Sequence, residues 1–405
     1  MSILPKEILR EMIVEGDLKT VNDLHTYLKE MFKDTLQEML EAELEVELGY
    51  AKGDKKNKNT DNRRNGTTPK TVNSRFGPLK LDIPRDRNGE FEPIVVPKHT
   101  RDISDIEEQI ISLYARGMST RDIHDQIKDL YGIEVSADMV SKITDKIIPK
   151  INEWKNRPLE PIYPFIFLDA IHYKVREDGQ IKNKAAYVVL GVTLDGYKDI
   201  LGIWIGENES SKFWLGVLND LKNRGVEDVL IFSVDGLTGL KDAIQAAYPN
   251  AEIQRCIIHQ LRNSFKYVNY KDLRQFADDF KEVYKAANEE VGYQKLLELD
   301  EKWGKKYPYA IKSWDMNWDV LSPFFKYPIE IRKIMYTTNI IEGVHRQFRK
   351  VTKTKSVFPT DLSLEKMLYL ASQNVMKKWT QRYRNWDSIL NQLLIFFEGR
   401  VEQYL

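Results

Sequence analysis

Apolar runs of strand length alternate with amphipathic helical segments between residues 156 and 260, and this alternation constrains the fold more than any other feature. The runs with the apolar content of buried strands are residues 164–170, 184–194, 200–205, 229–234 and 251–258. Helical patterns separate the last three of them, at residues 211–223 and around residues 240–247. Successive strands followed by helix–strand alternation predict an α/β sheet.

Two aspartates stand at the ends of strands in this segment. Asp169 follows the apolar run Phe165-Ile-Phe-Leu168, and Asp235 follows Ile231-Phe-Ser-Val234. A carboxylate in a buried strand is unfavourable unless it is paired or binds metal. Strand ends are also where ligands bind in open α/β sheets. One such aspartate alone is more often a cap or a turn residue, whereas two on neighbouring central strands indicate a metal site.

Helical spacing points to a third carboxylate, Glu342, in the first turn of a helix that begins at Asn339. Three cations lie on the same side of this helix, opposite its apolar face: Arg346, Arg349 and Lys353. A solvated face with i,i+4 ion pairs is the alternative interpretation. Together with Asp169 and Asp235, however, Glu342 predicts a site for two Mg²⁺ (or Mn²⁺) ions. Such a pair activates the attacking oxygen and stabilises the leaving oxygen when a phosphodiester is cleaved.

The charge is unevenly distributed, although 61 basic residues balance 61 acidic ones. Residues 1–48 are acidic, whereas residues 49–75 and 343–384 are strongly basic. Local cationic stripes of this kind suit phosphate binding. Residues 51–71 carry almost nothing apolar and are interpreted as a flexible or DNA-tracking linker, with a solvated loop as the alternative. A short strand or hairpin is expected next, at residues 76–84.

The N-terminal half is otherwise predicted to be helical. Residues 4–15 and 20–48 have helical spacing, and the second helix either faces a core or mediates dimerisation. Three further helices between residues 106 and 147 are expected to have Ile123, Ile127, Leu130, Val140, Ile143 and Ile147 inward. They suit a helix-turn-helix unit that binds DNA, or a small bundle with another role. The candidate DNA contacts of this unit are Arg121, Ser141 and Lys142.

Cys256 and His259 form a Cys-x-x-His motif after the last predicted strand. A structural zinc site needs four ligands, and Cys256 is the only cysteine, so a buried thiol beside a hydrogen-bonded histidine that supports the active site is the favoured interpretation. A single cysteine also excludes an intramolecular disulfide and fits a reducing cytoplasm. We expect no signal peptide and no membrane partner.

Several longer motifs resemble those of the Mutator-type transposases of bacterial insertion sequences, and the resemblance extends over nearly the whole chain. The segments that carry it include residues 84–93, 115–123, 187–191 and 213–221, together with Phe167-Leu-Asp-Ala-Ile-His172, Val234-Asp-Gly236, Arg255-Cys-Ile-Ile-His259 and Tyr336-Thr-Thr-Asn-Ile-Ile-Glu342. After Glu342 the chain reads Gly-Val-His345 where Ser-Leu-Asn is expected in relatives, which leaves the role of position 345 open.

The resemblance implies an α/β ribonuclease-H-like catalytic core, also consistent with the strand order, that is interrupted by an all-helical insertion and preceded by a helical DNA-binding region. It assigns the Asp–Asp–Glu triad to Asp169, Asp235 and Glu342. It further implies double-stranded DNA partners (terminal inverted repeats and target DNA), strand transfer by a 3′-hydroxyl, a homodimer or higher homo-oligomer, and a cytoplasmic, nucleoid-associated protein. We expect N-terminal helices at residues 1–48, a basic linker with a short β segment at 49–101 and a helix-turn-helix unit at 102–155. The first part of the core is expected at 156–260, the helical insertion at 261–336 and the C-terminal helices of the core at 337–405.

Overall fold

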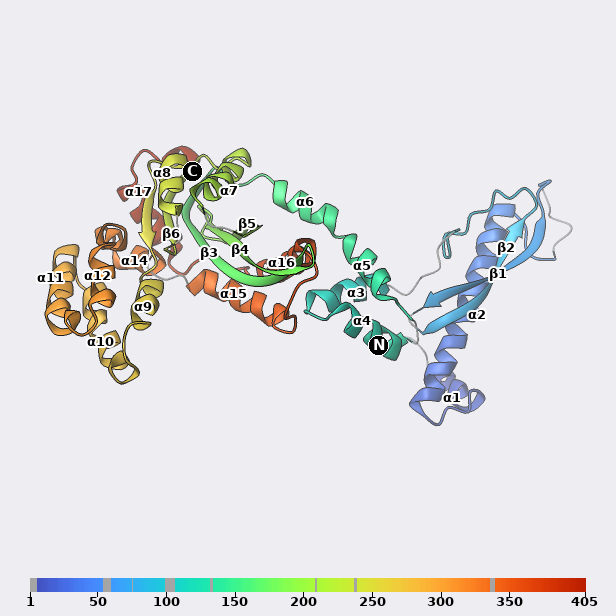
Figure 1. Cartoon of the computed structure of the whole chain (residues 1–405). Helices are drawn as coiled ribbons and strands as arrows, with labels where there is room; N and C mark the ends of the chain where they lie inside the picture. The colour runs from blue at the N-terminus through green and yellow to red at the C-terminus, as the bar shows by residue number, and fades with distance from the viewer. Residues whose placement is uncertain are drawn as a thin grey trace. The chain divides into compact units, whose positions relative to one another are not determined.

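The computed structural model describes residues 6–53, 60–74, 76–98, 106–131, 134–207, 210–236, 239–335 and 339–405 (Figure 1). The chain divides into two compact units. The first comprises residues 1–114 and 118–146, and the second comprises residues 115–117 and 147–405. Each unit is considered by itself below.

The first unit opens with a long helix that packs on a β-hairpin. Helix α1 (Lys6–Glu15) precedes α2 (Val21–Leu48), which begins at the capping box of Thr20. Strands β1 (Arg64–Ser74) and β2 (Gly77–Asp86) pair antiparallel. The buried side chains between α2 and the hairpin are Leu36, Leu40, Val72, Leu79, Leu81 and Val96. Burial of these apolar side chains is the main force that holds the hairpin on the helix.

The interpretation of residues 51–71 as a linker is wrong for its second part, because residues 64–71 belong to β1. This strand has few apolar residues of its own. It forms because β2 alternates apolar and polar residues, buries its apolar face on α2, and offers a hydrogen-bonding edge to β1. The register of pairing is therefore set by β2. Residues 54–59 lie outside the described part of the chain.

The rest of the first unit is a set of three short helices, as expected. They are α3 (Ile106–Ala115), α4 (Thr120–Tyr131) and α5 (Ala137–Asp145), and the Ser136 hydroxyl accepts a hydrogen bond from the N–H of Met139 to cap α5. The expected inward residues are buried, with one exception. Leu130, in the last turn of α4, is 58% exposed, so its inward placement was wrong.

The second unit is built on a mixed sheet of five strands in the order β5-β4-β3-β6-β7. The strands are β3 (Ile162–Glu177), β4 (Gln180–Val192), β5 (Lys198–Gly206), β6 (Asp228–Val234) and β7 (Glu252–Arg255). The first three form an antiparallel meander, whereas β6 runs parallel to β3 and β7 runs parallel to β6. The predicted α/β sheet and its meander are thus confirmed. The strand predicted at residues 251–258 ends at Arg255, because α9 starts at Ile257.

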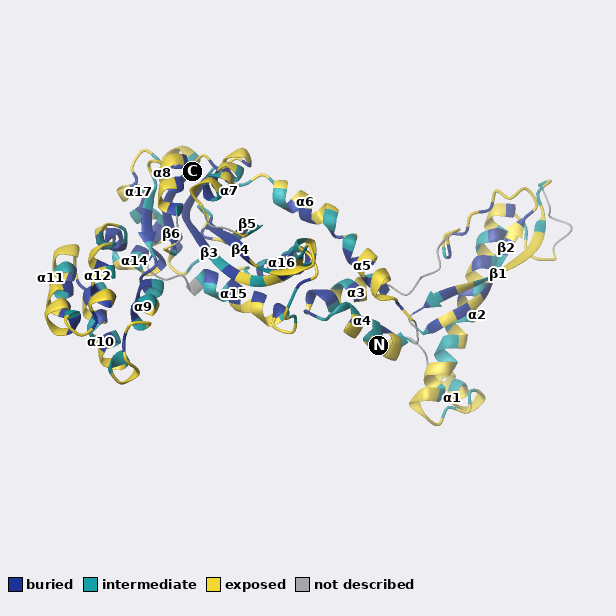
Figure 2. Ribbon diagram, viewed as in Figure 1, coloured by how far each residue is buried: buried dark blue, intermediate teal, exposed yellow. Residues whose placement is uncertain are grey.

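Helices cover both faces of this sheet (Figure 1). Helices α7 (Ser211–Asn223) and α8 (Leu240–Ala247) bury Trp214, Leu218 and Ile244 against one face. On the other face lie α15 (Asn339–Thr352) and α16 (Asp361–Met376), and the sheet between the two layers is buried over most of its length (Figure 2). Helix α6 (Ile148–Asn156) precedes β3. Pro149 lies in its first turn, where the N–H that proline lacks would have no partner within the helix.

Between β7 and α15 the described residues form helices and no strand. They are α9 (Ile257–Phe265), α10 (Leu273–Tyr284), α11 (Glu289–Leu299), α12 (Pro308–Asp315), α13 (Trp318–Leu321) and α14 (Ile329–Met335), and short turns of other helix types join some of them: Tyr270–Asp272, Asp300–Gly304 and Pro323–Lys326. Trp303 and Trp314 are buried in this layer. Helix α17 (Trp386–Phe396) and the short turn Glu402–Tyr404 end the chain. Among the described residues, no helix is both long and apolar enough to cross a membrane.

Candidate active site

The two strand-borne aspartates lie side by side because β3 and β6 are neighbours and run parallel. Their last paired residues are Leu168 and Val234, and Asp169 and Asp235 follow directly. The side chain of Asp169 is 9% exposed and that of Asp235 is 26% exposed. The pairing register therefore brings two carboxylates, 66 positions apart in sequence, together at the carboxyl end of β6.

His259 completes a cluster with these aspartates. It lies in the first turn of α9, which begins directly after β7, and Cys256 caps this helix: its Sγ accepts a hydrogen bond of 3.5 Å from the N–H of His259. One ligand atom from each of Asp169, Asp235 and His259 can be chosen so that all lie within 4.8 Å of one another. This spacing and the two carboxylates fit a divalent cation such as Mg²⁺ or Mn²⁺, which prefers carboxylate oxygens.

Glu342 approaches this cluster from α15. Its Oε1 lies 3.8 Å from Nε2 of His259, whose Nδ1 lies 3.6 Å from Oδ1 of Asp235. Glu342 is not one of the residues whose ligand atoms all lie within 4.8 Å of each other, so His259 connects it to the aspartates. The structure thus gathers Asp169, Asp235 and Glu342 at one place, with the glutamate farther from the pair of aspartates than they are from each other.

Arg262 and His345 contact the acidic residues, and neither contact was predicted. Arg262 donates from Nη1 to Oε1 of Glu342 at 2.5 Å and from Nη2 to Oε2 at 3.3 Å. Nδ1 of His345 lies 3.4 Å from Oδ2 of Asp169, and His345 is buried. Helical spacing was the available signal, since Arg262 follows His259 by three residues and His345 follows Glu342 by three.

The environment shifts the pKa values of Asp169, His259 and His345. Burial raises the pKa of Asp169 to about 6, although the charge of His259 opposes this rise. Burial alone would lower the pKa of His259, but Cys256 and the two aspartates outweigh it and raise that pKa to about 9. Burial, helped by the charge of Arg349, lowers the pKa of His345 to about 4. At neutral pH, a charged His259 therefore lies between acidic groups, whereas His345 is neutral.

The pKa of Glu342 follows the same balance of forces. Burial raises it, but the hydrogen bonds and charge of Arg262 outweigh burial and hold the pKa of Glu342 below its ordinary value. The charges of His259 and Arg346 act in the same direction. Glu342 is therefore an ionised carboxylate near neutral pH, as a metal ligand must be.

The predicted phosphate-binding cations are exposed along α15, as the helical spacing indicated. Arg346, Arg349 and Lys353 all face solvent, and the apolar side of the helix, with Ile341, Val344 and Phe348, is buried. In the first unit, Arg121 on α4 and Ser141 and Lys142 on α5 are exposed too. Exposure leaves these side chains accessible to DNA, and their contacts with it stay a prediction.

Known proteins match this sequence over nearly the whole chain. The family model described as "Transposase, Mutator family" matches residues 5–382. A probable transposase for the insertion sequence element ISRM3-like of Sinorhizobium fredii (strain NBRC 101917 / NGR234) is 40% identical over 398 residues, which cover 98% of this chain and 99% of that protein. The transposase for insertion sequence element IS905 of Lactococcus lactis is 34% identical and covers 89% and 92%. The transposase for IS256 in transposon Tn4001 of Staphylococcus aureus is 29% identical, covering 83% and 88%.

These matches confirm the resemblance of the sequence motifs, and they span both compact units. The chain belongs to the Mutator family of transposases.

Proposed function

We propose that this chain cleaves DNA at the ends of an insertion sequence and joins the freed ends to target DNA, with Asp169, Asp235 and Glu342 as the ligands of two divalent metal ions. One observation carries the proposal. This chain belongs to a transposase family, and the register of two parallel strands sets two aspartates side by side in it. The helix-borne Glu342 contacts His259, which lies against both aspartates.

The sheet supports a ribonuclease-H-like core for this catalytic unit. In such a core, three strands form an antiparallel meander, and two further strands, parallel to the first strand of the meander, extend the sheet beyond that strand. The order β5-β4-β3-β6-β7 agrees with that arrangement. The helices between β7 and α15 support an all-helical insertion at residues 261–336. It separates Glu342 from the aspartates in sequence and leaves them close in space.

The chain's own residues have distinct roles in this proposal. Asp169 and Asp235 bind the cations, and His345 holds Asp169 in place from the buried side. Cys256 fixes the start of α9 and with it the position of His259. Bound divalent ions would polarise the attacking oxygen and stabilise the leaving oxygen of the phosphodiester. With ions held in this way, no nucleophilic side chain of the protein would be needed.

Substrate binding is assigned to cations of both units. Arg346, Arg349 and Lys353 form a row that suits a DNA backbone, and they extend from the first turn that carries Glu342. In the first unit, the three helices α3 to α5 would read the terminal inverted repeats, with Arg121, Ser141 and Lys142 as contacts. Charge complementarity supports both assignments, since phosphate contacts dominate the affinity of proteins for DNA.

Self-association is part of the same proposal. Helix α1 contains no buried residue within the described chain, and Ile8, Leu9, Ile13 and Val14 on it are exposed. The first half of α2 likewise exposes Val21, Leu24 and Met31. Apolar surface of this extent favours burial against a second copy, as expected for a transposase that holds two DNA ends. Light scattering of the purified full chain should give a mass of at least twice 47.5 kDa.

Incubation of the full chain with labelled element ends, target DNA and Mg²⁺ tests the catalytic proposal. We expect nicked and joined products from the unchanged chain. Asp169→Asn, Asp235→Asn and Glu342→Gln should each abolish cleavage while end binding persists, because each removes a negatively charged ligand with little change in shape. Glu301→Gln, an exposed neutralisation in the helical layer, should cleave normally and serves as the matched control.

Each outcome has a clear meaning. Full cleavage by any of the three site variants would overturn the assignment of the triad. Nicks without joined products would identify a metal-dependent nuclease instead of a transposase. DNA binding with no effect of metal on any DNA product would identify a regulator that has lost catalysis.

A further inference from the structure

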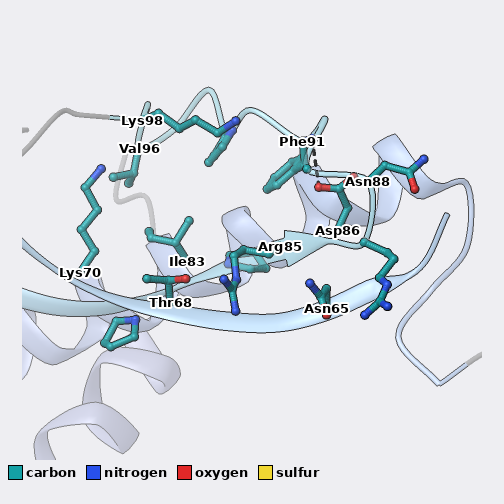
Figure 3. Close-up of a pocket in the computed structure, with 15 residues that line it drawn as sticks. Asn65, Thr68, Lys70, Ile83, Arg85, Asp86, Asn88, Phe91, Val96 and Lys98 are labelled. Atoms are coloured by element: carbon teal, nitrogen blue, oxygen red, sulfur yellow. Dashed lines mark hydrogen bonds between the residues drawn. The ribbon is translucent and has the colours of Figure 1, made fainter.

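A cavity of about 490 Å³ lies in the first unit, on the hairpin, outside the catalytic cluster (Figure 3). One wall is the hairpin itself, with Thr68 and Lys70 on β1 and Ile83 and Arg85 on β2. The other wall is the segment that follows β2, residues 87–98. Its volume falls in the range of cavities that hold small ligands or single units of a polymer.

Hydrogen bonds hold this second wall in place. Asp86 at the end of β2 is buried, and its carboxylate accepts bonds from Nδ2 of Asn62 at 2.8 Å and from the N–H groups of Glu90 and Phe91 at 3.1 and 3.2 Å. Farther along, the carboxylate of Glu43 on α2 accepts two backbone N–H groups at 3.0 Å each. The cavity is therefore bounded by ordered chain on both sides.

The lining of the cavity is cationic. Asp86 is the single acidic residue among those that line it. The four basic residues of the lining are Lys70, Arg85, Arg87 and Lys98. The carboxylate of Asp86 is occupied by the three N–H donors, so it offers little to a ligand. Arg85 and Arg87 are exposed, and neither forms an ion pair with another described residue. Lys98 pairs with Glu92, and Nζ of Lys70 donates to the carbonyl of Pro97 at 2.9 Å.

Apolar side chains form the floor. Val96 is fully buried and Phe91 is 6% exposed, while Ile83 lies at the hairpin side of the cavity. A ligand that fits must therefore combine negative charge for the arginines with an apolar or aromatic part for the floor. The sugar–phosphate backbone of DNA has this composition, since anionic phosphates alternate with deoxyribose rings and bases.

We propose that this hairpin cavity is a DNA-contact site, distinct from both the helices α3 to α5 and the catalytic cluster, and that it binds the sugar–phosphate backbone of one strand. Arg85 and Arg87 bind consecutive phosphates, and the apolar floor packs against a deoxyribose or a base. This inference rests on the proposed function only in taking DNA as the substrate. It adds a grip on DNA that depends little on sequence, because phosphates carry no base information.

The test is the salt dependence of DNA binding by the full chain, measured by fluorescence anisotropy with a labelled random-sequence duplex. Each lost phosphate contact lowers the slope of log K against log salt by about 0.9, equivalent to roughly tenfold in affinity near 0.1 M salt. We therefore expect the double variant Arg85→Ala/Arg87→Ala to lose about two units of slope. Arg85→Lys/Arg87→Lys should retain most of it, since the charges remain.

Lys6→Ala/Arg10→Ala is the matched control, because it removes the same charge from exposed residues of the same unit. It should leave the slope nearly unchanged. Thr68→Glu, which adds a carboxylate inside the cavity, should weaken DNA binding, and its circular dichroism should match that of the unchanged chain. Free deoxynucleotide at millimolar concentration should not displace the duplex, since one nucleotide lacks the second phosphate contact.

A double alanine variant with the slope of the control would overturn the proposal, and so would displacement by free nucleotide, which would indicate a mononucleotide site. These results are separable from the catalytic assignment. Intact binding by the cavity variants together with loss of cleavage in Asp169→Asn would refute the cavity and retain the active site. Weakened DNA binding by the cavity variants, together with no cleavage by the unchanged chain, would support the cavity and refute the active-site assignment.

Discussion

Replacing Arg262 by alanine should strengthen the binding of divalent cations, because this guanidinium contacts both carboxylate oxygens of Glu342. A cation that takes Glu342 as a ligand competes with it for the same oxygens. The Arg262 side chain is 53% exposed and that of Glu342 is 23% exposed, so solvent screens the pair, and its contribution is about 1 kcal/mol. Since 1.4 kcal/mol corresponds to a tenfold change, Mn²⁺ should bind about fivefold more tightly.

Isothermal titration of the full chain with Mn²⁺, in the absence of DNA, measures this effect directly. The Mn²⁺ affinity of Arg262→Lys should lie between those of the unchanged chain and of Arg262→Ala, since lysine retains the charge and loses the bidentate contact. Arg274→Ala, on an exposed position of α10, removes the same charge away from the cluster and should leave Mn²⁺ affinity unchanged. Unchanged or weaker binding in Arg262→Ala would refute the reasoning, because it would mean that the arginine and the cation do not compete for Glu342.

Three further predictions concern stability. Burial raises the pKa of Asp86, but three N–H donors lower it more, so the net pKa lies below its ordinary value. The ionised carboxylate therefore stabilises the fold above pH ~4, and this stabilisation is lost as the pH falls below that value. In Asp86→Asn, acid unfolding followed by circular dichroism should no longer show this pH-dependent loss of stability. Gly196→Ala should destabilise the second unit by about 3 kcal/mol in denaturant titrations, since Gly196 has φ +84° and a Cβ there would lie 2.4 Å from Cγ of Trp386. Gly179→Ala, with φ +76° and open space, should show only the smaller backbone strain, and an equal loss in both would refute the clash. Cys256→Ala should lose about 1 kcal/mol with the sulfur cap of α9, and rapid reaction of the native thiol with a labelling reagent would contradict its burial.

Sequence alone determined the features that depend on local patterns. The apolar runs of β3, β4 and β6 are long enough to specify buried strands without knowledge of their partners. Helix α15 could be divided into a buried and an exposed face by its spacing, and Asp169, Asp235 and Glu342 could be singled out because carboxylates in such positions need a partner. The family could be recognised because its motifs are spread over the whole chain.

Only the tertiary structure decided the features that depend on pairing and packing between distant segments. Strand β1 has no apolar pattern of its own and exists because β2 offers it an edge. The parallel register of β3 and β6 decides that Asp169 and Asp235 meet, and the packing of α9 and α15 near these strands decides that His259, Arg262 and His345 face the acids. The physical reason is that a pattern along the chain reports which side of an element is buried, whereas the partner buried against it is set by long-range packing.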